Sequence, residues 1–264
     1  MSLHSHDLLP AIPLLGHFQA LEELRLELPK LEEPSATSSR VRIELDLPSL
    51  RSFEIAAWRF HRSSLALLDK ANLPQLQILR FYKVRPEALG LAGLVRRHGA
   101  NLKHVELGEF SVNTTTDLFP YTPALVTLLI PSKMRVKEQL RGLPVSVTKV
   151  LLSGHMHNHA TFLDYTDLLK GLTIAVRGML SYRPPPEFHL VYGQNGLVYA
   201  KGKKRLWQEA WDALDQPGQP KEQPVLMIFL AAARPLLALD VVLVDEDGVS
   251  LQHVVKGVER LLEP

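Results

Sequence analysis

Leu76-Gln77-Ile78-Leu79-Arg80-Phe81 is the stretch that decides the fold, because its pattern L-x-x-Φ-x-Φ, with Φ an apolar residue, recurs along the chain. Clear copies occupy residues 21–26, 50–55 and 102–107, and weaker copies occupy residues 125–130 and 147–152. The copies begin 29, 26, 26, 23 and 22 residues apart. A repeat period in the twenties predicts a solenoid, in which each unit stacks on the next one.

Each copy of the phrase predicts a short strand with one buried face, because its apolar positions alternate with polar ones. In the copy at residues 50–55, Phe53 and Ile55 are expected to point inward while Ser52 and Glu54 point outward. One such strand cannot bury its apolar face alone, so neighbouring copies are expected to stack in register as a parallel sheet. The alignment predicts one buried row, which consists of Leu24, Phe53, Leu79, Val105 and Leu128.

Between the copies of the phrase, apolar residues recur at the spacing of a helix instead of that of a strand. Residues 87–98 carry Leu91, Leu94 and Val95 on one stripe, and residues 161–170 form a second helical pattern that Gly171 is expected to close. The repeating unit is therefore strand, turn, helix, turn. Since a helix is wider than a strand, we expect the array to curve with its strands on the inside.

Over about residues 21–182, the chain resembles a leucine-rich repeat protein. The resemblance rests on the repeated phrase, on its period and on the helical segments between the copies. The resemblance implies an α/β solenoid with parallel strands on the concave face and short helices on the convex face. The repeats are degenerate, because the asparagine expected just after the strand is missing; residues 102–107 continue as Gly108-Glu109-Phe110. We expect residues 1–182 to form the solenoid and residues 183–264 to form a C-terminal α+β extension or cap.

The tail begins with Pro184, Pro185 and Pro186, which remove backbone donors and favour an extended chain. Residues 188–192 and 197–200 flank Asn195-Gly196 and predict a hairpin. The all-apolar residues 225–230 predict a strand covered on both faces, and residues 250–262 predict a helix. Residues 236–241 fit the repeat phrase again, so they predict either a terminal repeat or a strand of a small α+β domain.

Composition excludes several classes of protein. The chain has 264 residues, no cysteine and a formal net charge of +2. No disulfide, thiolate nucleophile or cysteine-bound zinc is therefore possible, and the absence of cysteine favours a reducing cytoplasm. The small net charge gives no reason to expect nucleic acid as a partner. Residues 1–7 lack the basic region and long apolar core of a signal peptide, and no apolar run reaches membrane-spanning length, so a membrane partner is not expected either.

Three histidines, His155, His157 and His159, are the weak candidates for metal ligands, because alternate residues of a strand project from one face. A polar turn after the strand at residues 147–152 is the favoured interpretation, since no carboxylate is placed to complete the site. No nucleophile elbow, phosphate-binding loop or metalloprotease motif is present. We therefore expect no catalysis, no metal, no cofactor and no small-molecule substrate.

The favoured function is a non-catalytic module that binds another protein through the concave strand face. The outward strand positions supply the expected contact set: Glu22, Glu23, Arg25, Arg51, Ser52, Glu54, Gln77, Arg80, Lys103, His104 and Glu106. Arg51, Arg80 and Lys103, on three successive strands, are expected to form one column. Two alternatives stay open, namely a substrate-adaptor subunit of a larger complex and an enzyme whose site lies in the C-terminal segment.

Overall fold

The computed structural model describes residues 2–4, 17–28, 45–57, 70–82, 91–107, 118–131, 136–154, 162–192, 223–245 and 247–262. The chain divides into two compact units. The first unit consists of Met1–Leu128 with Gly142–Val147, and the second consists of Leu129–Arg141 with Thr148–Pro264. The boundary expected between a solenoid at residues 1–182 and an extension or cap at residues 183–264 stays a prediction.

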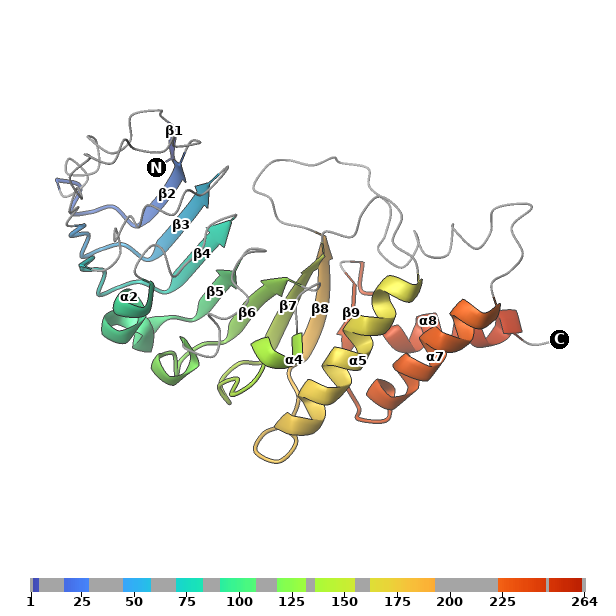
Figure 1. The fold of residues 1–264 in the computed structure, drawn as a ribbon. Helices are drawn as coiled ribbons and strands as arrows, with labels where there is room; N and C mark the ends of the chain where they lie inside the picture. The colour runs from blue at the N-terminus through green and yellow to red at the C-terminus, as the bar shows by residue number, and fades with distance from the viewer. Residues whose placement is uncertain are drawn as a thin grey trace, which may run out of the picture. The chain divides into compact units, whose positions relative to one another are not determined.

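Parallel strands follow one another in chain order through the first unit (Figure 1). They are β1 (Ser2–His4), β2 (Glu23–Leu28), β3 (Ser52–Ala57), β4 (Ile78–Tyr82) and β5 (His104–Leu107), and β6 (Thr127–Pro131) begins at the end of the unit. From β2 onward, each strand begins at the third residue of its L-x-x-Φ-x-Φ phrase. The predicted strands are therefore confirmed, whereas β1 was not predicted.

The expected buried row is present in the first unit. Leu24 lies opposite Phe53, Phe53 opposite Leu79, and Leu79 opposite Val105 in the strand register. These four side chains and Leu128 are each at most 2% exposed. Burying one such side chain contributes about 1.5–3 kcal/mol to folding, so stacking successive repeats stabilises the unit.

One turn recurs before the strands and fixes their register. The amides of Leu50, Leu76, Leu102 and Leu125 each donate to the carbonyl three residues earlier, at 3.0–3.1 Å. The carbonyl of the second phrase residue then accepts two amides from the next repeat. These carbonyls belong to Glu22, Arg51, Gln77 and Lys103, and we call these four residues the pre-strand row. Because this pattern repeats without slippage, equivalent residues of neighbouring repeats lie side by side.

Among the described residues of the first unit, the helical segments are α2 (Leu91–His98) and two 3-10 turns, η2 (Gly99–Asn101) and η3 (Phe119–Tyr121). Leu91, Leu94 and Val95 are buried, as their helical spacing predicts. Residues 87–90 of the predicted helix lie outside the described residues. Gly99 follows α2 where the chain passes close to Tyr121, and a Cβ at Gly99 would overlap the Tyr121 carbonyl oxygen.

The second unit also combines parallel strands with helices. Its strands β7 (Lys149–Gly154), β8 (Glu187–Tyr192) and β9 (Leu243–Val244) pair in that order. The helices described in this unit are α4 (Val136–Gln139), α5 (Phe162–Met179), α7 (Gln223–Leu237) and α8 (Leu251–Leu262). In Figure 1, α5 and α7 lie side by side, and α7 also contacts α8. The predictions of β8 and α8 are confirmed.

Three predictions for the second unit were wrong. Residues 225–230 belong to helix α7, because Leu226, Phe229 and Leu230 bury one helical face. Leu236 and Leu237 end that helix, so residues 236–241 form neither a repeat phrase nor a strand, and β9 begins at Leu243. Helix α5 continues past Gly171 to Met179, since later apolar residues extend its buried stripe. The second arm of the predicted hairpin lies outside the described residues.

Candidate functional site

The outward positions of β2 to β5 include two rows that cross all four strands. One row contains Glu23, Ser52, Ile78 and His104, and the other contains Arg25, Glu54, Arg80 and Glu106, each residue opposite the next. Adjacent strands lie about 4.8 Å apart, so neighbouring side chains of a row are within contact distance. The second row alternates in charge from strand to strand, and we call it the charge ladder.

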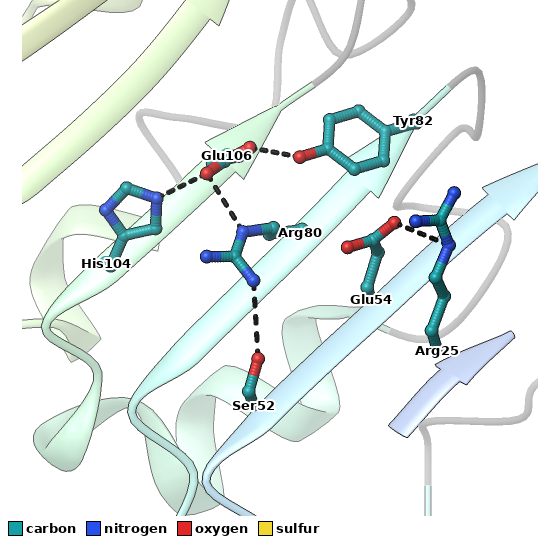
Figure 2. A network of polar contacts seen from close by, with 7 residues as sticks. All are labelled: Arg25, Ser52, Glu54, Arg80, Tyr82, His104 and Glu106. Carbon is teal, nitrogen blue, oxygen red and sulfur yellow. Dashed lines mark hydrogen bonds and ion pairs between the residues drawn. The ribbon is translucent and has the colours of Figure 1, made fainter. Parts of the chain in front are cut away.

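The charge ladder consists of two ion pairs, which Figure 2 shows from close by. Arg25 Nε lies 3.1 Å from Glu54 Oε1, and Arg80 Nε donates to Glu106 Oε1 at 2.9 Å. Arg80 also donates from Nη1 to Ser52 Oγ at 3.3 Å, which links β4 back to β3. The ladder therefore neutralises its own charges by pairing them between neighbouring strands.

Glu106 is the centre of the network, with only 5% of the residue exposed. Its Oε1 accepts hydrogen bonds from Arg80 and from His104 Nε2, the latter at 2.6 Å, and its Oε2 accepts one from the Tyr82 hydroxyl (Figure 2). Burial alone would raise the pKa of Glu106, but these hydrogen bonds outweigh burial and lower the pKa below its ordinary value. Glu106 is therefore an anion near neutral pH.

The partners of Glu106 are held in their donor forms. Burial and the charge of Glu106 raise the pKa of Tyr82, so its hydroxyl keeps its proton. Burial alone would lower the pKa of Arg80, but the hydrogen bond and charge of Glu106 raise it, so the guanidinium stays charged. A carboxylate fixed as acceptor between fixed donors can orient side chains. It is poorly suited to act as a general base, which needs a pKa near the working pH.

Exposure separates the expected contact set into three groups. Glu22, Glu23, Arg51 and Lys103 are exposed, and Arg25, Glu54, Gln77, Arg80 and His104 are half-buried. Ser52 and Glu106 are buried and support their neighbours instead of presenting an open surface. Whether any of these residues binds a partner stays a prediction.

The expected column of Arg51, Arg80 and Lys103 is wrong. Arg51 and Lys103 lie in the pre-strand row, where their equivalent on the β4 repeat is Gln77. Arg80 is three residues further along the phrase, inside β4, and it is paired with Glu106. Residues at the same phrase position of successive repeats lie side by side across the sheet. Arg80 is at a different phrase position from Arg51 and Lys103, so the three residues cannot lie in one line.

Tyr82 was missed by the sequence analysis, although it completes the Glu106 network. It follows the last apolar residue of its phrase, and its register partner on β3 is Ala56. The alternation of inward and outward residues could have identified Tyr82. If the phrase at residues 76–81 is extended by one residue, the next position points outward. A tyrosine there is placed to reach a neighbouring strand.

The metal candidates His155, His157 and His159 lie outside the described residues. Within the described residues, no group of three or more histidine, aspartate or glutamate side chains is placed to hold a metal ion. Among those residues, no helix combines the length and apolar character needed to cross a membrane.

Comparisons with known proteins give a structural likeness but no match in sequence. No protein-family model matches the chain, and no curated protein matches it. A solved structure that is similar is the leucine-rich repeat-containing protein LegL7 from Legionella pneumophila, with 12% identity and a TM-score of 0.36. The match covers 100% of this chain and 99% of that chain.

Proposed function

We propose that this chain is a non-catalytic, leucine-rich-repeat-like module that binds another protein through the polar face of β2 to β5. In this proposal the pre-strand row, which directly precedes these strands, supplies charged contacts at one edge of the surface. The charge ladder and the Glu106 network lie further along the same strands and connect their outward side chains.

The self-neutralised charge ladder is the observation that carries this proposal. Because Arg25 pairs with Glu54 and Arg80 with Glu106, these four charges already have partners. Glu22, Arg51 and Lys103 are exposed, and no ion pair joins them to another of the described residues. Charges of this kind raise association rates and select partners of complementary charge. Contact energy with a partner is therefore expected from the pre-strand row.

The protonation states within the network favour binding over catalysis. Glu106 is held as an anion and Tyr82 as a neutral hydroxyl, so neither group is poised to exchange a proton near neutral pH. A rigid array of donors and acceptors is instead what recognition of a polar protein surface requires. The repeat pattern of the sequence supports the same class of function.

Affinity capture from the native host, followed by mass spectrometry, tests the proposal. Wild type is compared with the double variant Arg51→Glu/Lys103→Glu and with the control Arg96→Glu, an exposed change on α2. The proposal predicts proteins that are recovered with wild type and with the control but are lost with the double variant. Equal recovery with all three chains would contradict it.

A further inference from the structure

Helix α7 in the second unit is apolar on both of its faces. Leu226, Phe229, Leu230, Ala233 and Leu236 form the buried face. The opposite face carries Pro224, Met227, Ile228, Ala231 and Pro235, which we call the α7 stripe. Met227 is 55% exposed and Ile228 is 44% exposed. A helix that is hydrophobic all round is normally buried on all sides, yet the part of the chain that the structure describes leaves this stripe exposed.

The α7 stripe has the dimensions of a helix-binding surface. Its residues are spaced at i, i+3, i+4, i+7 and i+11, which places them along one side of the helix. At 1.5 Å per residue, the stripe is about 17 Å long, or roughly three turns of a partner helix. Methionine is common on surfaces that accept apolar helix faces, because its flexible side chain adapts to different shapes.

Exposed charges described on α5, α7 and α8 are mostly basic. They are Lys170 and Arg177 on α5, Arg234 on α7, and Lys256 and Arg260 on α8. The acidic side chains described on these helices are Asp167 and Glu259, and Glu259 is paired with Arg234 at 2.9 Å. Ile174 adds an exposed apolar side chain between Lys170 and Arg177 on α5. The helical surface therefore combines apolar and cationic side chains.

The exposed apolar and cationic side chains indicate, by charge complementarity, which kind of partner would cover the α7 stripe. A second copy would bring two basic surfaces together, which like-charge repulsion opposes. An anionic lipid surface is usually entered by bulky aromatic and leucine side chains, which the α7 stripe lacks. We propose that the α7 stripe binds an amphipathic helix of another protein, whose apolar face packs on Met227 and Ile228 and whose edges carry acidic residues. This surface is separate from the strand face and does not depend on the function proposed for that face.

Two designed peptides test this proposal with the full-length chain. Both carry leucine along one helical face, and the remaining positions are glutamate in one peptide and lysine in the other. Fluorescence anisotropy measures binding of each peptide to wild type, to Met227→Gln/Ile228→Gln and to the control Val145→Gln. Val145 is an apolar residue of the first unit and is 66% exposed. Circular dichroism checks that the double variant keeps its helices.

The proposal predicts that the glutamate peptide binds wild type at least about tenfold more tightly than the lysine peptide. The double variant should weaken binding of the glutamate peptide at least about tenfold, since two apolar contacts are lost, and Val145→Gln should leave it unchanged. Equal binding of both peptides, no binding, or an unaffected double variant would overturn the proposal. It would also be overturned if Met227→Gln/Ile228→Gln abolished self-association of the chain, or if only vesicles of phosphatidylcholine and phosphatidylserine bound.

Discussion

Arg80 on β4 lies directly opposite Glu106 on β5, and its Nε donates to Glu106 Oε1 at 2.9 Å. The repeat spacing creates this pairing, because both residues occupy the same position of successive L-x-x-Φ-x-Φ phrases. His104 and Tyr82 complete the surroundings of the carboxylate. One acidic side chain therefore connects two adjacent repeats on the polar face of the sheet.

Replacing Glu106 with Gln should lower the free energy of unfolding by roughly 1.5–3 kcal/mol, the range for hydrogen bonds to charged groups. The variant removes the negative charge but keeps the shape, so Arg80 is left without its counter-ion. Urea unfolding followed by circular dichroism measures the change. Arg51→Glu is the control and should alter stability by less than about 0.5 kcal/mol, as exposed substitutions usually do. A fully stable Glu106→Gln variant would show that the network is not structurally important.

The stability that Glu106 contributes should depend on pH. Its pKa in the folded protein is below the ordinary value of 4.5, so the unfolded chain binds the proton more tightly. The contribution is therefore fully present above the unfolded pKa and is lost as the pH falls through the folded pKa. Unfolding free energies of wild type and Glu106→Gln, measured from about pH 7 to pH 3, should converge toward the acidic end. A constant difference across this range would contradict the assigned pKa shift.

Replacing Gly99 with Ala should destabilise the protein by about 1–3 kcal/mol, as overpacking usually does. The added Cβ would overlap the Tyr121 carbonyl oxygen and lie 2.8 Å from Val95 Cγ1. The matched control is Gly178→Ala in α5, because a Cβ there meets no atom within 4 Å. That control should be neutral or stabilising by up to about 1 kcal/mol, since alanine favours helix. Thermal unfolding distinguishes the two variants, and equal melting temperatures would argue against the close approach.

Replacing Leu79 with Ala should cost about 2–5 kcal/mol, because it opens a cavity in the buried row between Phe53 and Val105. Val126→Ala is the control, since Val126 is 41% exposed and should change stability by less than about 0.5 kcal/mol. Guanidinium unfolding of both variants provides the comparison. A Leu79→Ala variant as stable as the control would contradict the packing of the repeats.

The repeat phrase predicted the strands well, because alternation of apolar residues is a local property of the sequence. It failed where that alternation is absent. Residues 225–230 are apolar throughout, so neither the strand period nor the helix period could be recognised. Gly171 suggested the end of a helix, but Leu172 and Val176 extend the buried face of α5 and outweigh the local preference of one glycine.

The polar face was predicted only in outline. Sequence identified the outward residues, but their pairing depends on strand register, which places Arg80 against Glu106 and separates it from Arg51. Burial also changed the roles of individual residues. Ser52 and Glu106 are polar and point outward, yet both are buried by neighbouring side chains, which the residue type alone does not reveal.

The dissociation constant of the captured partner protein is the measurement that tests the central claim most directly. Titrations compare wild type, the pre-strand double variant Arg51→Glu/Lys103→Glu and the α2 control Arg96→Glu, with stability checked for each. The account predicts at least about tenfold weaker binding for the double variant and an unchanged constant for Arg96→Glu. An unchanged constant for the double variant, together with a loss of binding for Arg96→Glu, would contradict it.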